Sequence, residues 1–237
     1  TRIEDFGNYK LGWLRTVLPY ENGVPSHDTI GRVLGMLDPD ALEALFMRWM
    51  SDVAKNVEGV VAIDGKTLRG AIRRGDKKSF VHMVSAFGSA NGLVYGSVKV
   101  SEKSNEIEAI PRLLELLYLK GALVTIDAMG CQTEIAAKIV DEGADYCLAV
   151  KGNQPTLHEG IKSFFLDHLE DDFARIKVSE HHTKETGHGR VDERSYYLCE
   201  VSDDLPDADR WKDFCAIGMS INNTQRRKGD EIAVRYY

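Results

Sequence analysis

The stretch VVAIDGKTLRG at residues 60–70 decides the fold prediction. It opens with an apolar run that is typical of a strand inside a sheet, and Asp64 follows this run directly. We therefore expect Asp64 to be buried, where an unpaired carboxylate would cost several kcal/mol. A salt bridge to Lys66 or Arg69 would offset this cost, and so would a bound metal ion. The residues alone leave both alternatives open.

Length and composition predict a globular protein. The chain has 237 residues, of which 43% are hydrophobic and 28% charged, enough for one large domain with an appendage or for two small domains. It contains no apolar run of about 18 residues and does not begin like a signal peptide, so we expect a cytoplasmic protein without a membrane segment. The cysteines form no C-x-x-C pair and are predicted to be buried free thiols. They are Cys131, Cys147, Cys199 and Cys215.

The charge distribution is uneven. A net charge of −7 argues mildly against nucleic-acid binding, because a groove for phosphates is basic. However, residues 66–78 carry six basic residues and one acid, directly after Asp64. This segment is either a solvated loop or a strip that binds phosphate.

The periodicity divides the chain into a helical and a mixed part. Residues 1–57 carry helix caps at Ser26 and Asp38 and apolar residues at helical spacing, which predicts an N-terminal helical subdomain. From residue 59, three short strands follow, and Asn91-Gly92 predicts a hairpin between the second and third. A helix is expected over 104–121, and the next strand ends at Asp127.

Helices and strands then alternate up to residue 169, and residues 171–237 read as a β-rich part. This order predicts an α/β fold, a mixed sheet with flanking helices whose parallel strands are buried on both faces. Pairing of the first strand with the fourth would bring Asp64 and Asp127 together at the carboxyl ends of these strands, where ligands bind in such sheets. Two neighbouring carboxylates in a dry site require a proton or a cation.

Seven stretches of the sequence resemble stretches of one protein family, and they occur in the same order as in that family. The sequence is similar to the H-repeat-associated proteins linked to Rhs elements, which belong to the DDE transposases and have a ribonuclease H-like fold. The stretches are NGVPSHDTIGRV (22–33), AIDGKTLRG (62–70), EKSNEIEAIPRLL (102–114), TIDAMGCQ (125–132), LAVKGNQ (148–154), HGRVDER (188–194) and VRYY (234–237). The resemblance implies a ribonuclease H-like catalytic domain over 58–237.

The resemblance also implies a reaction, the Mg2+-dependent cleavage and transfer of DNA strands at the ends of an insertion element. Asp64 and Asp127 would be the first two acidic residues of the catalytic triad and bind Mg2+, for which Mn2+ is a surrogate. The third, a glutamate, is expected on a helix after the RYY strand, beyond Tyr237. The other candidates within the sequence are Asp192 and Glu193, and Glu106, whose position is one at which ribonuclease H-type enzymes often carry a carboxylate. Asp192 and Glu193 would alternatively pair with arginines of their own strand.

Carboxylates suit this chemistry. Two Mg2+ ions roughly 4 Å apart can activate the attacking oxygen, stabilise the leaving oxygen and neutralise charge on phosphorus. Magnesium prefers hard oxygen ligands and keeps several waters, so two or three carboxylates on rigid strands suffice.

The resemblance further implies contacts with double-stranded DNA, by a homodimer near the bacterial nucleoid. The predicted DNA-binding residues are Lys66, Arg69, Arg73, Arg74, Lys151, Asn153, Gln154, His188 and Arg190. For Lys151, Asn153 and Gln154, a helix-capping turn before Pro155 is an equal alternative. Two competing hypotheses remain: an inactive DNA-binding remnant, and an unrelated metal-dependent α/β enzyme in which Asp64 pairs with Lys66. The chain lacks a glycine-rich phosphate loop, which disfavours nucleotide-binding versions of the latter.

Overall fold

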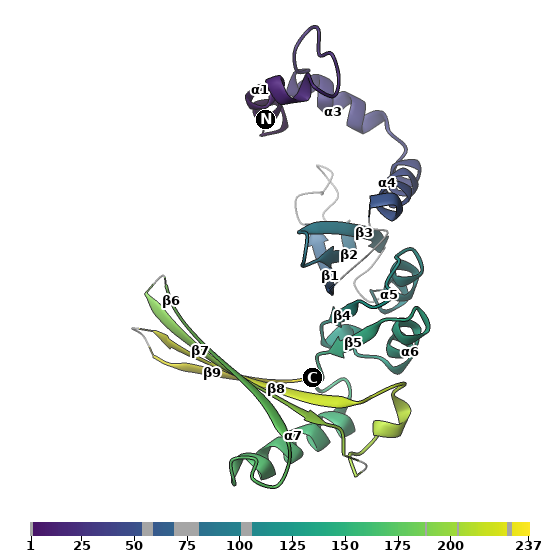
Figure 1. The fold of residues 1–237 in the computed structure, drawn as a ribbon. Helices are drawn as coiled ribbons and strands as arrows, with labels where there is room; N and C mark the ends of the chain where they lie inside the picture. Colours follow the sequence, from purple (N-terminus) through teal and green to yellow (C-terminus); the bar gives the residue numbers. More distant parts are fainter. Residues whose placement is uncertain are drawn as a thin grey trace, which may run out of the picture. The chain divides into compact units, whose positions relative to one another are not determined.

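A computed structural model describes residues 2–53, 59–68, 81–100, 106–187, 189–202, 204–226 and 229–237 (Figure 1). The chain divides into two compact units, Thr1–Trp49 and Met50–Tyr237. Because residues 54–58 lie outside the described ranges, the boundary predicted at 57/58 stays a prediction. No helix in these ranges is both long and apolar enough to cross a membrane.

The first unit is helical, as predicted. Its caps explain where the helices begin: Ser26 Oγ accepts the amide hydrogen of Thr29 at 3.3 Å, and Asp38 Oδ1 accepts the amide hydrogen of Asp40 at 2.9 Å. The helices are α1 (Arg2–Tyr9), α2 (Leu11–Leu14), α3 (His27–Met36) and α4 (Pro39–Val53), the last of which continues past Trp49 into the second unit.

The second unit contains a five-stranded mixed sheet in the order β3-β2-β1-β4-β5. Strands β1, β2 and β3 are antiparallel, whereas β1, β4 and β5 are parallel. The predicted ribonuclease H-like mixed sheet is therefore confirmed, including the hairpin whose turn contains Gly92 at φ +69°. The strands are β1 (Val60–Leu68), β2 (Val81–Gly88), β3 (Leu93–Val100), β4 (Leu123–Ile126) and β5 (Asp145–Leu148).

Two helices, α5 (Glu106–Glu115) and α6 (Thr133–Asp141), lie on the same side of this sheet (Figure 1). The prediction that the parallel strands are buried on both faces is wrong. Along β4, Val124 and Ile126 are buried, but Leu123 is exposed and Thr125 half-buried. Side chains alternate between the faces of a strand, and only one face of β4 is fully covered in the described part of the chain.

A second sheet, antiparallel and four-stranded, follows in the order β6-β7-β8-β9. Its strands are β6 (Val178–Gly187), β7 (Arg190–Glu200), β8 (Ala216–Arg226) and β9 (Glu231–Tyr236). Helix α7 (Pro155–Leu169) packs on β9, where the ring of Phe165 stacks on Tyr236 at 6.5 Å between centroids. The two sheets join where the Val150 amide donates to the Tyr236 carbonyl at 2.8 Å.

Candidate active site

The register of β1 against β4 places the two predicted aspartates side by side. The parallel pairing runs from Val60 opposite Leu123 to Ile63 opposite Ile126, and Asp64 and Asp127 are the next residues on each strand. Asp127 directly follows β4, and Asp64 lies within β1, directly after the last residue that pairs with β4, so the two residues are adjacent. The expectation that pairing of the first and fourth strands brings them together is confirmed.

Asp64 is not buried, contrary to our expectation. It is exposed, whereas Val61 and Ile63 are 0% and 3% exposed. Because successive side chains alternate, Val61 and Ile63 face the core and Asp64 faces the other side of the sheet. No salt bridge joins Asp64 to Lys66 within the described residues. The carboxylate thus keeps its contact with water and needs no buried counter-ion.

Asp127 has a local structural role as well. It begins a short 3-10 helix, η3 (Ala128–Gly130), and its Oδ1 accepts the amide hydrogen of Met129 at 3.1 Å. Its second oxygen, Oδ2, has no hydrogen-bond partner in the described part of the chain. One oxygen of Asp127 therefore fixes the turn while the other stays available to a ligand.

Glu106, the first residue of α5, packs against Gly65, the residue that follows Asp64 in β1. A Cβ atom added at Gly65 would lie 2.5 Å from Glu106 Oε2 and 2.8 Å from Oε1. The Glu106 residue is only 8% exposed, and no hydrogen bond or ion pair involves its carboxylate among the described residues. A buried carboxylate without a partner is costly, so this group is suited to a cation. The sequence signal for this contact is Gly65, since a glycine inside a strand pattern often marks the close approach of another group.

The turn that follows β5 directs the side-chain amides of Asn153 and Gln154 to backbone carbonyls. Asn153 Nδ2 donates to the Ala128 carbonyl at 2.7 Å and the Cys131 carbonyl at 3.3 Å, and Gln154 Nε2 donates to the Cys131 carbonyl at 3.0 Å. Backbone carbonyls thus occupy these donors in the protein alone, and the contact of these amides with DNA stays a prediction. The alternative, a helix-capping turn before Pro155, agrees with the structure: Gln154 N donates to the Lys151 carbonyl at 2.9 Å, and Gln154 is the N-cap of α7, although its side chain makes no cap bond.

Among the predicted cationic residues, Lys66 and Lys151 are exposed and form no ion pair within the described ranges. Lys66 lies within β1, two residues after Asp64, and Lys151 lies three residues after the end of β5 at Leu148. Four others, Arg69, Arg73, Arg74 and His188, lie outside the described residues.

Asp192 and Glu193 lie in β7, where their partners belong to the four-stranded sheet. Asp192 is 5% exposed and accepts a hydrogen bond from Thr224 Oγ1 at 2.8 Å. Its Oδ2 is 2.9 Å from Arg190 and 3.5 Å from Arg194, and Glu193 is paired with Lys184 at 2.6 Å. Asp192 therefore pairs with arginines of its own strand, whereas Glu193 pairs with a lysine of β6, and the predicted DNA contact Arg190 is engaged with Asp192.

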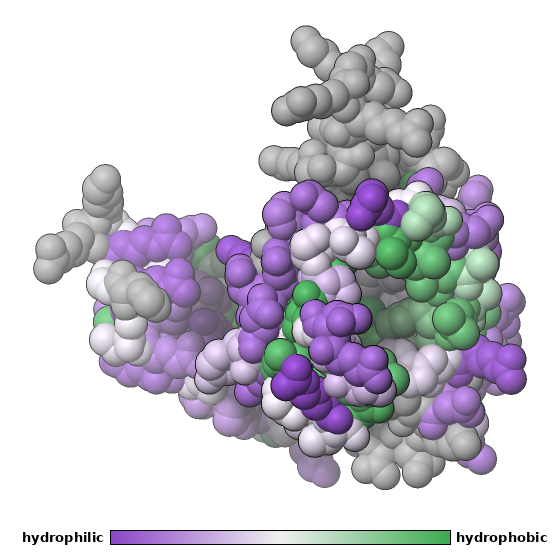
Figure 2. All heavy atoms as spheres, turned by 90° about the horizontal axis from the view of Figure 1, so that it is seen from above, coloured by the Kyte–Doolittle hydropathy of each residue, from purple (hydrophilic) through white to green (hydrophobic). Residues whose placement is uncertain are grey.

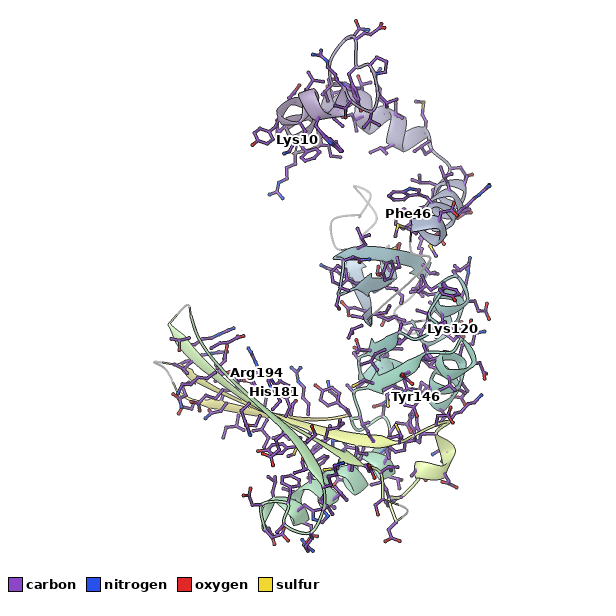
Figure 3. The ribbon with its side chains drawn as sticks, in the orientation of Figure 1. Lys10, Phe46, Lys120, Tyr146, His181 and Arg194 are labelled. Carbon is purple, nitrogen blue, oxygen red and sulfur yellow. The ribbon has the colours of Figure 1, made fainter. Side chains whose placement is uncertain are left out.

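Asp192 and Arg194 lie on one face of the four-stranded sheet, and Glu193 with Lys184 lies on the other. Thr183 is paired with Arg194 and His181 with Tyr196, so Arg194 and His181 share a face, as Figure 3 shows. Hydrophilic residues predominate on the part of this sheet seen in Figure 2, at the left. The hydrogen bond from Thr224, together with Arg190 and Arg194, lowers the pKa of Asp192 below its ordinary value.

Asp192→Asn is expected to lower stability at neutral pH. A carboxyl whose pKa is lower in the folded state stabilises the fold at pH values above its unfolded pKa, and this contribution is lost as the pH falls through the folded value. The deficit of the variant should therefore shrink as the pH is lowered below about 4. Urea unfolding of both proteins at pH 7 and pH 3 measures this. Glu193→Gln, at a half-buried site, should cost less, and a deficit for Asp192→Asn that does not change with pH would contradict the prediction.

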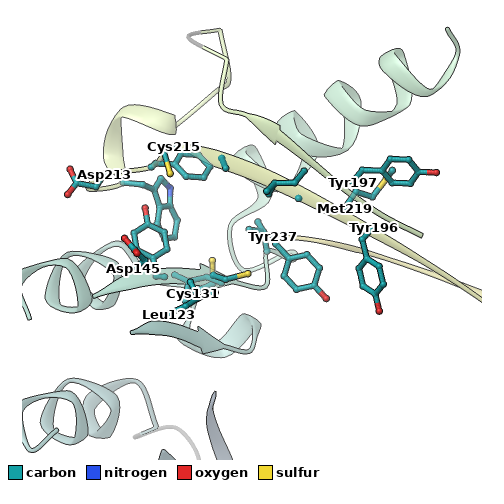
Figure 4. Close-up of a pocket in the computed structure, with 18 of the residues that line it drawn as sticks. Leu123, Cys131, Asp145, Tyr196, Tyr197, Asp213, Cys215, Met219 and Tyr237 are labelled. Atoms are coloured by element: carbon teal, nitrogen blue, oxygen red, sulfur yellow. The ribbon is translucent and has the colours of Figure 1, made fainter. Parts of the chain in front are cut away.

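An apolar pocket of about 680 Å3 lies between the two sheets (Figure 4). Leu123 and Cys131 line one wall, and Tyr196 and Tyr237 line the other. None of the predicted site residues lines it. Cys131 is a buried free thiol, as expected, and burial raises its pKa to about 12. A thiol with such a pKa is protonated and unreactive at neutral pH. Cys199 is buried too, but Cys147 is half-buried and Cys215 exposed.

The oxygen donors of Asp64, Asp127 and Glu106 are the type that Mg2+ and Mn2+ prefer. Within the described residues, however, no group of three or more His, Cys, Asp or Glu side chains is close enough together to hold a metal ion. The local arrangement is thus Asp64 within β1, Asp127 directly after β4, and the Glu106 carboxylate beside Gly65.

Comparison with known proteins identifies similar sequences over the whole chain. Residues 55–214 match the family described as "Transposase DDE domain", and residues 1–50 match "DDE_Tnp_1-associated". The chain is 48% identical to "Putative transposase YncI" of Escherichia coli strain K12, covering 86% of this chain and 81% of that protein. It is 39% identical to "H repeat-associated putative transposase YhhI" of the same strain, covering 99% of this chain and 63% of that protein.

A protein of Escherichia coli O157:H7, also named "Putative transposase YncI", is 42% identical over 99% of this chain. The chain spans 61% of the length of this relative.

Proposed function

Because this chain belongs to the DDE transposase family, we propose that it carries the metal-binding core of an enzyme that cleaves and transfers DNA strands at the ends of an insertion element. The observation that carries this proposal is the parallel register of β1 and β4, which makes Asp64 and Asp127 neighbours at one end of the sheet. The family implies a divalent metal, and we propose Mg2+, with Mn2+ as its surrogate.

In this proposal Asp64 and Asp127 bind the metal. Glu106 is the third carboxylate that this part of the chain offers, although it lies beside Gly65, on the face of β1 opposite to Asp64. A bound divalent ion would supply Lewis acidity for the displacement at phosphorus. The chain itself provides fixed oxygen donors: Asp64 from a paired strand, Asp127 from a hydrogen-bonded turn and Glu106 from the start of a helix. Glu106 is preferred over Asp192 because it is unpaired among the described residues, whereas Asp192 contacts two arginines.

Contact with double-stranded DNA is assigned to the exposed lysines, Lys66 and Lys151. Each lies within a few residues of a parallel strand end, and an ammonium group there would hold a phosphate by charge without reading sequence. Arg69, Arg73, Arg74 and His188 remain proposed contacts. We expect a homodimer on DNA at the nucleoid, and light scattering with and without a DNA duplex measures the predicted mass change.

Calorimetric titration of Mn2+ into the 237-residue protein tests the metal site. Wild type should bind in the micromolar to millimolar range, and Asp64→Asn and Asp127→Asn should each weaken binding at least tenfold. Both variants should fold, because Asp64 is exposed and an asparagine at 127 retains an oxygen that can accept the Met129 amide hydrogen.

The matched pair for the third carboxylate is Glu106→Gln and Glu108→Gln. Both residues lie in the first turn of α5, but Glu106 is buried beside Gly65 and Glu108 is exposed. We expect only Glu106→Gln to weaken Mn2+ binding. Binding that is unchanged by both aspartate substitutions would overturn the proposed metal site.

A second candidate function is DNA binding without catalysis. The observation in its favour is that no three metal-ligating side chains come together among the residues that the structure describes. Gel-shift measurements with a DNA duplex distinguish the two: this candidate predicts binding that does not depend on Mn2+ and is unchanged by Asp64→Asn.

A further inference from the structure

The turns after β4 and β5 are tied together by side-chain amides. We define the Asp127 turn as residues 127–132, which contain the 3-10 helix η3. From the turn after β5, Asn153 reaches the carbonyls of Ala128 and Cys131 at 2.7 Å and 3.3 Å, and Gln154 reaches that of Cys131 at 3.0 Å. The carbonyls involved lie near the two ends of the Asp127 turn.

The Asp127 turn also contains hydrogen bonds of its own. Gly130 N donates to the Asp127 carbonyl at 3.1 Å, and Gln132 N donates to the Gly130 carbonyl at 2.9 Å. The carboxylate Oδ1 adds one further bond, to the Met129 amide. Two longer bonds complete the set: Cys131 N donates to the Ala128 carbonyl at 3.3 Å, and Gln132 Nε2 donates to the Met129 carbonyl at 3.4 Å. Because hydrogen bonds in a single turn of 3-10 helix have poor geometry, the bonds from Asn153 and Gln154 add to the order of this turn.

We propose that Asn153 and Gln154 are positioning residues, which hold the Asp127 turn so that the Asp127 carboxylate is fixed beside Asp64. This inference rests on the proposed metal site. A ligand that is ordered before binding loses less conformational freedom when the cation binds, and so binds it more tightly. Groups that orient a metal ligand in this way typically change metal affinity by about 10-fold to 100-fold when they are replaced.

The hydrogen-bond inventory favours this role over a direct contact with DNA. Phosphate oxygens require donors, and an asparagine amide has two N–H groups. The two acceptors of Asn153, the Ala128 and Cys131 carbonyls, account for both of these donors. A DNA contact through Asn153 Nδ2 would therefore leave a backbone carbonyl of the Asp127 turn without this partner.

Isosteric substitutions test the inference on the whole chain. Asn153→Asp and Gln154→Glu keep the side-chain shape but replace the donating nitrogen by a carboxylate oxygen, which faces the same carbonyls and is repelled by them. The added negative charge would by itself attract Mn2+, so weaker binding can only come from the lost geometry. Thr156→Ala, at an exposed position in the first turn of α7, is the control.

Two readouts are needed. Hydrogen–deuterium exchange of a peptide that covers residues 127–132 reports the order of the turn itself, whether or not metal binds. Mn2+ titration calorimetry reports the consequence for the carboxylate, and thermal unfolding confirms that the fold is retained. We expect faster exchange in this peptide and Mn2+ affinity reduced about 10-fold to 100-fold for Asn153→Asp and Gln154→Glu, with Thr156→Ala unchanged in both.

The outcomes separate the inference from the proposed function. Unchanged exchange in the variants would overturn the inference, as would faster exchange with unchanged Mn2+ affinity when Asp127→Asn still weakens binding. If Asp64→Asn and Asp127→Asn leave Mn2+ binding unchanged, the proposed metal site fails. Exchange alone then decides whether the two amides hold the turn.

Discussion

Asp127→Asn is expected to reduce metal-dependent cleavage of a DNA duplex by at least about 1000-fold. A divalent ion contributes several kcal/mol of charge stabilisation to the transition state, and each 1.4 kcal/mol changes a rate by about tenfold. The substitution removes a negative charge from one of the two adjacent proposed ligands while an oxygen remains for the Met129 amide. Cleavage of an end-labelled duplex carrying element ends, followed over time in Mn2+, measures the rate.

Glu108→Gln serves as the control for this assay, because Glu108 is exposed. It should cleave at the wild-type rate. Cleavage by Asp127→Asn at the wild-type rate would contradict the prediction and would indicate a contaminating nuclease or a different site. A wild-type chain that binds DNA and Mn2+ but leaves the duplex intact would favour the DNA-binding candidate.

Phe165→Ala is expected to cost about 3–5 kcal/mol of unfolding free energy, the range for removing a buried phenylalanine ring. Phe165 is 0% exposed, and its ring contacts those of Phe173 and Tyr236 with centroids 6.3 Å and 6.5 Å apart. The substitution leaves a cavity between α7 and β9, where the four-stranded sheet rests on the helix. Urea unfolding followed by circular dichroism measures the loss.

The neighbouring ring provides the matched comparison. Phe164 is half-buried and packs edge-on against Phe165 and His168. Phe164→Ala should therefore cost clearly less than Phe165→Ala. Equal losses of unfolding free energy for the two variants would contradict the prediction that the packing of Phe165 between α7 and β9 stabilises the fold.

The order of helices and strands was readable from the sequence because its signals are local. The apolar run before Asp64, the Asn91-Gly92 turn and the apolar strand before Asp127 each depend on neighbouring residues only. Once the strands were ordered, the adjacency of Asp64 and Asp127 followed from a parallel pairing. This local information was sufficient for the fold and for two of the candidate ligands.

Burial and side-chain partners were predicted less well, because they depend on contacts between distant parts of the chain. The apolar residues before Asp64 gave no indication of which face of β1 is covered, so the exposure of Asp64 was missed. Likewise, the amides of Asn153 and Gln154 looked free in sequence, and only the fold brings them to carbonyls more than 20 residues away. The hydrogen bond between Asp192 and Thr224, which lies on the neighbouring strand β8, could not be read from the sequence either.

The close approach of Glu106 to Gly65 limits how this sequence can drift over evolutionary time. A methyl group at position 65 would lie 2.5–2.8 Å from the carboxyl atoms of Glu106, so the two positions cannot change independently. Relatives with alanine or serine at position 65 are expected to carry a shorter residue at position 106. Two combinations should thus recur: glycine at position 65 with glutamate at position 106, and a larger residue at position 65 with a shorter residue at position 106. An alignment of the family would reveal this pairing as covariation.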